Sequence, residues 1–320
     1  MITKAFTMSL AFLVALACSE ERAPITAEPG SGGSGGSGGG GAALTGGGPS
    51  ADASSGDATA TGGKGGTACP ADAKGAKMVL VTTSSGPRYC IDEREVSQGE
   101  YLAFASDKGN DVSGQPAECA DNKSYVPALP DPYIGAPQPG TCHKDYWQGN
   151  PERPMVCVDF CDAAAYCKWA GKRLCTSLDA QSDAVLKVKD AELEALAKDN
   201  RLEWTDACTQ GGKTAWPYGD AYVPGTCIDK TRYDAQGPSA LDATKLEGET
   251  CHGATQPYSS IFHMSGSVAE WVNGCDEGMG YCLVLGGSIS SASEPCQLPA
   301  MTFRTSTAPW HGIRCCADLE

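Results

Sequence analysis

Apolar and β-branched residues recur on both sides of a turn near the start of the folded part of the chain. The segment KMVLVTTSSGPRYCIDEREVS, residues 77–97, carries them before and after SSGP, with Tyr89 in the second run. Serine, glycine and proline between two such runs are typical of a tight turn. The pattern therefore predicts two short strands joined as a hairpin.

Apolar residues spaced three and four apart predict two helices after the hairpin. The first lies in SQGEYLAFASDKG, where Ser97 and Glu100 have the spacing of a capping box and Gly109 can end the helix. The second lies in VDFCDAAAYCKWAGKRL, where Asp159 can cap the helix and Gly171 can end it.

A third helix is expected over residues 179–198, DAQSDAVLKVKDAELEALAK. After it the chain offers short segments separated by turn residues, including WPYGD, FHMSGSVAEWV and LVLGGS. A few helices combined with many short strands and long irregular loops indicate the α+β class.

The first residues of the chain have the pattern of an export signal. A basic residue, Lys4, precedes the apolar run MSLAFLVALA, which is too short to span a bilayer. Residues 1–17 are therefore predicted to be a signal peptide. Small residues directly before Cys18 resemble a bacterial lipobox and predict that Cys18 carries lipid. Because Ala15 stands where a branched residue is usual, ordinary cleavage to a soluble secreted protein remains the alternative.

Residues 18–68 contain mainly glycine, serine, threonine and alanine, as in SGGSGGSGGGG. Such a composition cannot bury enough apolar surface to offset the entropy of ordering, so this stretch is predicted to be a flexible tether. Residues 69–320 are long enough for one sizeable domain. The expected location is the bacterial outer membrane or cell surface, reached through Cys18, or otherwise the periplasm or the medium.

The charge of the chain argues against two classes of partner, nucleic acid and anionic lipid. A formal net charge of -15 repels nucleic acid and anionic lipid alike, so neither is expected to bind.

Cysteine use points to disulfides rather than to metal. The chain has 17 cysteines, and without Cys18 their number is even, as expected for full pairing after export. The spacing of the four cysteines in the middle of the chain does not match the paired two-residue gaps of a zinc ribbon. The long loop over residues 110–154 contains Cys119 and Cys142 and is expected to be cross-linked. Because Cys161 and Cys167 face different sides of their helix, we expect them to bond different partners.

Six sequence islands occur in an order that resembles the formylglycine-generating enzyme, or sulfatase-modifying factor, family. They are CIDEREVSQGEYLAF, PMVCVDFCDAAAYCKWAGKRLCT, WPYGD, HMSGSVAEWV, VLGGS and GIRCCAD, and they cover residues 78–318. The resemblance implies the family's irregular α+β variant of the C-type lectin fold. It also implies an oxidase that converts a sulfatase cysteine, in a Cys-x-Pro-x-Arg context, to formylglycine with copper and oxygen.

The resemblance also points to the place where copper(I) would bind. In the family, two cysteines three and eight residues beyond the serine of Gly-Gly-Ser hold the metal. Counted from Ser288, these positions are Ser291 and Cys296, so one thiolate is replaced by a hard hydroxyl. The residues therefore favour Cys296 as a structural cross-link. Catalysis that involves Cys296 and Ser288 is the alternative, and a serine after two glycines can also simply close a turn.

The GSVAEW island implies a structural calcium site in the family, built from an Asn or Asp side chain, two backbone carbonyls and a glutamate. The matching positions are His263, Gly266, Val268 and Glu270. Oxygen donors suit calcium, whereas the nitrogen of His263 does not. The alternative is that Glu270 and Trp271 only hold the core together.

These observations favour an exported, lipid-anchored member of the family that binds an unknown protein or glycan ligand or has a structural role. The named alternative is a formylglycine-generating oxidase acting on a sulfatase polypeptide. A third hypothesis, a cysteine-dependent oxidoreductase, rests on the neighbouring Cys315 and Cys316.

Overall fold

The computed structural model describes residues 66–127, 150–290, 292 and 294–320. The signal peptide, Cys18, Cys142, Ser291 and most of the tether lie outside the described residues. The elements follow in this order: β1 Met78–Thr82, β2 Arg88–Asp92, α1 Gln98–Lys108, η1 Ala117–Cys119, α3 Phe160–Trp169, β3 Arg173–Leu174, β4 Leu186–Val188, α4 Asp190–Lys198, α5 Glu203–Cys208, α6 Lys230–Gln236, η2 Gly237–Leu241, η3 Tyr258–Ser260, β5 Ala269–Asp276, β6 Tyr281–Leu285, β7 Ala300–Phe303, β8 His311–Gly312 and β9 Cys315–Ala317.

One sheet joins the two ends of the folded part. Its strand order is β1-β2-β9-β3, and β1 and β2 form the predicted antiparallel hairpin. The last strand, β9, pairs with both β2 and β3. Beside this sheet the backbone N–H groups of Thr67 and Ala68 donate to the carbonyl of Glu320, at 2.9 and 3.3 Å. The tether therefore joins the domain where the chain also ends.

The second sheet carries the segment that later forms the candidate site. Its strand order is β4-β5-β6-β7, and β8 pairs with β5 off this path. Seven of the eight residues of β5 are buried. The register of β5 against β6 shifts between Trp271 and Cys275, which marks a bulge. β6 leads directly into Gly286.

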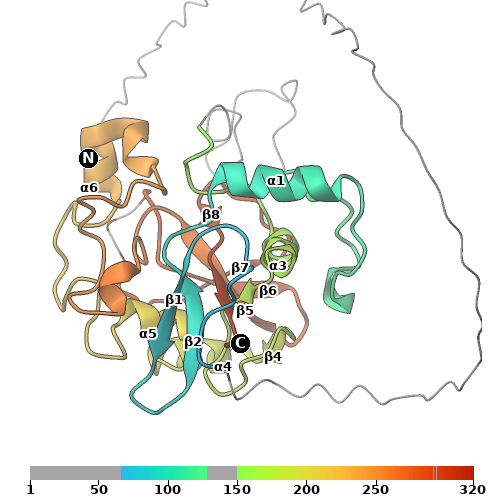
Figure 1. Ribbon diagram of the computed structural model, residues 1–320, viewed down its shortest axis with the longest axis horizontal. Helices are drawn as coiled ribbons and strands as arrows, with labels where there is room; N and C mark the ends of the chain where they lie inside the picture. The colour runs from blue at the N-terminus through green and yellow to red at the C-terminus, as the bar shows by residue number, and fades with distance from the viewer. Residues whose placement is uncertain (1–65, 128–149, 291, 293) are drawn as a thin grey trace, which may run out of the picture. The chain divides into compact units, whose positions relative to one another are not determined.

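The two helices with predicted caps form as expected. Ser97 and Asp159 each accept a hydrogen bond from the backbone of the third helical residue, and a full capping box is present in both α1 and α3. Figure 1 shows α1 running past the side of α3, which is seen end-on. Tyr101 and Phe104 of α1 pack against Tyr166 of α3. Their ring centroids lie 5.8 and 5.7 Å, respectively, from that of Tyr166.

The prediction of a helix over residues 179–198 was wrong in its first half. The helix, α4, begins only at Asp190. Leu186–Val188 instead form β4, which pairs in parallel with residues 274–276 of β5. The β-branched and apolar residues of this stretch suit a strand beside a buried partner, and this tertiary pairing outweighs helix propensity.

Disulfides cross-link most parts of the domain. Cys161 and Cys167 bond different partners, as predicted: Cys119 and Cys315, respectively. Cys157 is disulfide-bonded as well. The further pairs within the described residues are Cys69–Cys90, Cys175–Cys316, Cys208–Cys296, Cys227–Cys251 and Cys275–Cys282.

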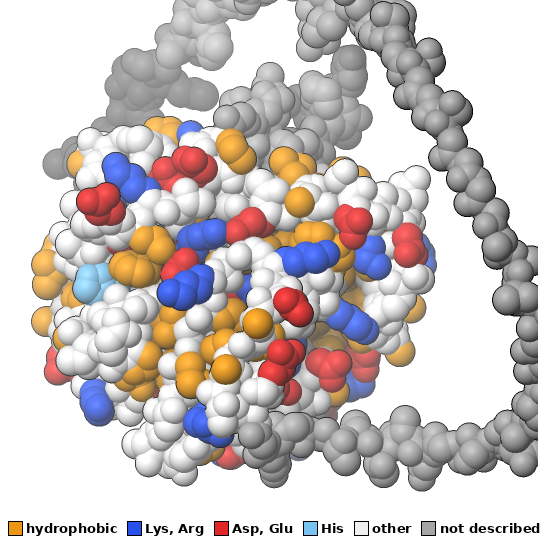
Figure 2. Space-filling model, viewed as in Figure 1, with side chains coloured by type: hydrophobic (Ala, Val, Ile, Leu, Met, Phe, Trp, Pro, Cys, Tyr) orange, Lys and Arg blue, Asp and Glu red, His pale blue; other side chains and the backbone are white. Residues whose placement is uncertain are grey.

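The mixture of short strands, short helices and irregular loops confirms the α+β class. Trp204 and Trp271, both fully buried, lie in two separate apolar clusters, and the Cys208–Cys296 disulfide belongs to the cluster of Trp204. Acidic and basic side chains are interspersed on the face seen in Figure 2, with apolar side chains between them. None of the helices in the described ranges has the length and apolar character needed to cross a bilayer.

Candidate functional site

The loop after β6 starts with two glycines whose backbone conformations a side chain would strain. Gly286 and Gly287 have φ of 96° and 66°. A Cβ on Gly286 would lie 3.1 Å from the carbonyl oxygen of Met264 and from the ring of Trp204. A Cβ on Gly287 would lie 2.8 to 3.1 Å from the side chain of Glu294. The pair therefore allows the loop to lie close against the core.

Ser288, the serine of the Gly-Gly-Ser motif, is buried and makes local hydrogen bonds. Its Oγ lies 2.7 Å from Oγ of Ser290 and accepts from the backbone N–H of Ser290 at 3.3 Å. This geometry is that of a serine closing a turn. Ser291, the other position expected near the family's metal, lies outside the described residues.

Cys296 forms a disulfide with Cys208, the last residue of α5. Both residues are fully buried. The backbone N–H of Cys296 donates to the carbonyl of Ala215 at 2.8 Å, which fixes the loop next to the disulfide. The cross-link favoured for Cys296 is therefore present, and the structure identifies Cys208 as its partner.

Copper(I) does not fit this donor set. A soft metal ion binds thiolates, and the sulfur of Cys296 is bonded to another sulfur. A bonded sulfur has no thiolate charge to offer. The described residues of this loop thus disagree with the copper site that the resemblance implies.

His263 is held between two acidic side chains. Its Nδ1 lies 3.2 Å from Oε2 of Glu95, and its Nε2 lies 3.0 Å from Oε2 of Glu249, the latter an ion-pair contact rather than an aligned hydrogen bond. Burial alone would lower the pKa of His263, but the charges of Glu95 and Glu249 outweigh it and raise the pKa to about 9. His263 is therefore a buried imidazolium at neutral pH.

Glu270, on β5, is neutralised by Arg314. The guanidinium donates to both carboxylate oxygens of Glu270, with Nε–Oε2 and Nη2–Oε1 distances of 2.8 and 2.9 Å. Trp204 Nε1 also donates to Glu270, at 2.6 Å. Arg314 is fully buried and donates in addition to the backbone carbonyls of Asp92 and Phe262. The carboxylate of Glu270 thus has its full set of partners within the chain.

The other two positions of the expected calcium site would offer only backbone carbonyl oxygens, and their other groups have structural contacts. The backbone N–H of Gly266 donates to the carbonyl of Gly286 at 2.7 Å, and a Cβ on Gly266 would lie 2.6 Å from the carbonyl oxygen of Ile228. The side chain of Val268 is buried against the backbone of Gly312, where a Cβ would lie 2.3 Å away.

Calcium does not fit these four positions. The ion prefers several oxygen ligands with net negative charge. His263 supplies a protonated nitrogen, and the one acidic side chain of the set, Glu270, is already paired with a cation. The full burial of Glu270 fits the alternative interpretation, in which this residue only holds the core together. The sequence did not identify Glu95 and Glu249 as partners of His263. Glu95 lies 168 residues from His263 in the sequence, and Glu249, although nearer, is separated from it by an irregular loop, so no periodic pattern links them.

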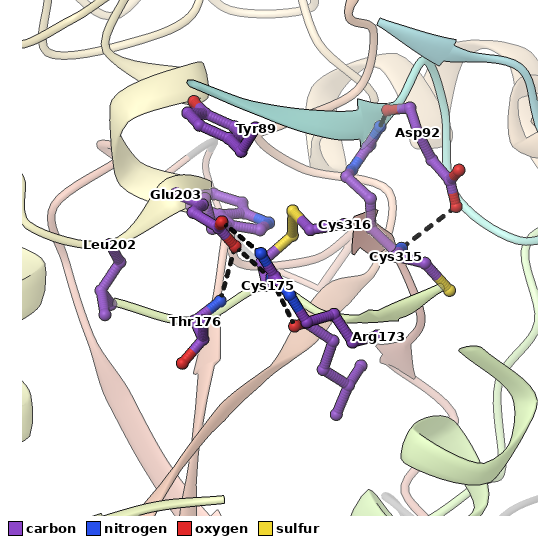
Figure 3. Close-up of a disulfide and its surroundings, with 12 residues drawn as sticks. Tyr89, Asp92, Arg173, Cys175, Thr176, Leu202, Glu203, Cys315 and Cys316 are labelled. Atoms are coloured by element: carbon purple, nitrogen blue, oxygen red, sulfur yellow. Dashed lines mark hydrogen bonds and ion pairs between the residues drawn. A yellow bond between two sulfur atoms is a disulfide. The ribbon is translucent and has the colours of Figure 1, made fainter. Parts of the chain in front are cut away.

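The neighbouring Cys315 and Cys316 bond to two different elements, as Figure 3 shows for the second of the two disulfides. Cys315 bonds Cys167 of α3, and Cys316 bonds Cys175, which follows β3. The four residues are fully buried or nearly so. These bonds anchor the last strand and leave the oxidoreductase hypothesis without an exposed cysteine at this place.

Glu203 lies close to Cys175 and Cys316, so the three could in principle form a metal-binding cluster. The two sulfurs are bonded to each other, and Glu203 pairs with both terminal nitrogens of Arg173 at 2.6 and 2.7 Å (Figure 3). Glu203 also accepts from the backbone N–H of Thr176 at 2.9 Å. The cluster is therefore a structural cross-link and not a metal site.

Half-buried aromatic side chains lie in the loop next to the Cys208–Cys296 disulfide. Trp216 directly follows Ala215, and its ring centroid is 6.3 Å from that of Tyr222. The hydroxyl of Tyr222 donates to Asp229 at 2.6 Å, and the backbone N–H of Val223 donates to the hydroxyl of Tyr218 at 3.2 Å. Because each ring is fixed by a hydrogen bond or a neighbouring ring, these side chains form a preorganised surface. We call the surface formed by Trp216, Tyr218 and Tyr222 the aromatic loop.

Comparison with known proteins places this arrangement in a family. Residues 64–319 match the model of the Sulfatase-modifying factor enzyme 1-like domain. A Formylglycine-generating enzyme from Streptomyces coelicolor is 29% identical over 142 residues, which cover 38% of this chain and 41% of that protein. The chain thus matches less than half the length of this curated relative.

Two solved structures are also similar. PvdO from Pseudomonas aeruginosa is 17% identical, with a TM-score of 0.42, over 77% of this chain and 92% of that one. Treponema denticola variable protein 1 is 15% identical, with a TM-score of 0.36, over 77% and 92% of the respective chains.

Proposed function

Because the chain belongs to the sulfatase-modifying factor family, we propose that it is a non-catalytic binding or structural member of that family at the bacterial cell envelope. Its fold is the α+β variant of the C-type lectin fold that characterises the family. In this proposal the domain is exported, anchored through a lipid on Cys18 and held on the flexible tether of residues 18–68.

One observation carries the non-catalytic part of the proposal: Cys296 is bonded to Cys208 inside the core. A catalytic thiol has to be deprotonated and reachable by its substrate. Cys296 has neither property, because its sulfur is bonded and both cysteines are fully buried.

The ligand surface that we propose is the aromatic loop. Tryptophan and tyrosine side chains provide large contact areas at a low cost in conformational entropy, and they are common in protein and sugar recognition. Trp216 and Tyr222 are held in place by their neighbours, and Val223 beside them is 50% exposed. A protein or glycan ligand would pack on this surface without any change in the core.

Alkylation without reduction tests the non-catalytic proposal. The purified folded domain is unfolded in denaturant with iodoacetamide and mapped by mass spectrometry. We expect a Cys208–Cys296 linked peptide and no alkylated Cys296. In parallel, the domain is incubated with copper and a Cys-x-Pro-x-Arg peptide, and no aldehyde should form. Alkylated Cys296 together with aldehyde formation would instead support the alternative, a formylglycine-generating oxidase acting on a sulfatase polypeptide.

Binding is tested separately on a glycan array and against envelope proteins, with Trp216→Ala as the variant. Loss of binding in this variant supports the aromatic loop as the ligand surface, and unchanged binding contradicts it. Membrane anchoring is tested by fractionating cells that express the full chain or Cys18→Ala. We expect the variant to move from the membrane to the soluble fraction.

A further inference from the structure

The charged side chains around His263 form a buried cluster whose charges balance within the chain. His263 lies between the carboxylates of Glu95 and Glu249. Glu249 also accepts two hydrogen bonds from the half-buried Arg232, at 2.7 and 2.8 Å. Arg314 pairs with the third carboxylate, that of Glu270. The acids are Glu95, Glu249 and Glu270, and the cations are His263, Arg232 and Arg314.

The cluster is closed to water at its centre. Glu95, Glu270, His263 and Arg314 are fully buried, and Glu249 is nearly so. Each ring nitrogen of His263 faces one carboxylate, Nδ1 that of Glu95 and Nε2 that of Glu249, so a protonated ring satisfies both acids. Three negative and three positive groups therefore face one another in a region where an uncompensated charge is costly.

A divalent cation would disturb this balance. Calcium would have to displace the guanidinium of Arg314 from Glu270 or the imidazolium of His263 from its two acids. Without such a displacement the core would carry two excess positive charges and would be destabilised. The neighbouring pair of Lys172 and Asp92, 2.5 Å apart, is already matched and offers no spare negative charge.

We infer that His263 and Arg314 replace the structural calcium ion at this position, so that the domain is held together by its own cations. The role of a metal ion, to neutralise converging acids and so fix the segment before β5, is taken over by two side chains. The positive φ of His263, 60°, places its ring between Glu95 and Glu249, and histidine tolerates this conformation better than most residues. This inference does not depend on whether the protein is catalytic.

The first test uses the unmodified domain and the metal alone. Thermal unfolding is followed in a chelator and in increasing calcium chloride, with calcium binding measured by calorimetry on the same sample. We expect the same Tm throughout and no saturable heat of binding. A saturable calcium-dependent rise in Tm that is lost in Glu270→Gln would overturn the inference.

The second test asks whether charge pairing, and not shape alone, is what His263 contributes. The variants are His263→Gln, Glu95→Gln and the double variant. His263→Gln should lower Tm by several degrees, because it removes the cation beside the buried Glu95 and leaves Glu249 with Arg232 alone. The double variant should be clearly more stable than the sum of the two single losses predicts. Strictly additive losses would contradict the inference.

A surface pair provides the control for this cycle. Lys230 and Asp234 form an ion pair in which both side chains are more than half exposed. The same cycle with Lys230→Gln and Asp234→Asn should show almost no coupling, because exposed pairs are screened. Should the His263 variants fail to fold, the calcium titration of the unmodified domain still decides the question.

Discussion

Two regions of the domain differ in different ways from the metal sites that the resemblance to the family implies. At the Cys208–Cys296 disulfide, a covalent bond removes the thiolate that copper(I) would need. Around His263 and Arg314, ion pairs take the place of a calcium ion. The first change depends on an oxidising compartment and the second on protonation. The comparison indicates that a covalent bond and a set of ion pairs can each fix a segment of this fold by the chain's own groups.

The ion-pair region is expected to be the more sensitive of the two. Arg314→Met leaves the carboxylate of Glu270 buried without its cation, and breaking such a pair costs about 3–5 kcal/mol. The free energy of unfolding is measured by denaturant titration. Arg201→Met is the control, because Arg201 pairs with Asp179 while both side chains are more than half exposed. That control should lose less than about 1 kcal/mol. Equal losses would contradict the assignment.

The disulfide is the covalent counterpart, and its loss should be slightly less severe. Replacing Cys208 and Cys296 by alanine opens a loop with a sequence separation of 88 residues and should cost about 2–4 kcal/mol. The same double substitution at Cys227 and Cys251, separated by 24 residues, should cost about 1 kcal/mol less, because a shorter loop has less entropy to regain. Unfolding free energies of both variants test this order, and the reverse order would contradict it.

The dependence of stability on pH should distinguish the contributions of the two buried histidines, His263 and His311. The pKa of His263 is raised from 6.5 to about 9 in the folded domain, so its contribution is complete below about pH 6.5 and is lost as the pH rises to about 9. Because one pKa unit corresponds to about 1.4 kcal/mol, this contribution should be about 3 kcal/mol. Tm measured from pH 6 to 10 should therefore fall, and the fall should be smaller in His263→Gln.

His311 is the opposite case. Burial lowers its pKa from 6.5 to about 4, so its contribution to stability is lost as the pH falls through this range. His311→Gln should reduce the acidic loss and leave the alkaline one unchanged. If His311→Gln changed the loss of stability equally at acidic and at alkaline pH, the pKa directions given for His263 and His311 would be wrong.

The smallest effect is expected at the Gly-Gly-Ser loop itself. Ser288→Ala removes hydrogen bonds to Ser290 and should cost about 0.5–1.5 kcal/mol in unfolding free energy. The Cys208–Cys296 bond should remain, as checked by non-reducing peptide mapping. Loss of that bond in the variant would show that Ser288 has a larger role than closing the turn.

Local sequence signals predicted the elements that depend on local contacts. The capping boxes at Ser97 and Asp159 located α1 and α3, and the turn residues located the β1–β2 hairpin. The helix expected from residue 179 began only at Asp190, because β4 pairs with a strand more than 80 residues away.

The candidate site was predictable only in part for the same reason. The sequence located Cys296 and Glu270, but their partners, Cys208 and Arg314, are set by the tertiary fold. A disulfide between residues 88 positions apart leaves no periodic trace in the sequence, since many pairings satisfy the same composition. His263 looked unsuitable for calcium from its chemistry alone, while its acidic partners became visible only in the structure.

The Cys208–Cys296 disulfide and the ion pairs of His263 and Arg314 leave no ligands for copper(I) or calcium among the described residues at the two positions. Metal content after exposure of the unreduced domain to copper(I) and calcium, followed by gel filtration and elemental analysis, tests this central claim most directly. The account predicts that neither metal is retained with the protein. Retention of one equivalent of copper that is lost in Cys296→Ala, or one of calcium that is lost in Glu270→Gln, would contradict it.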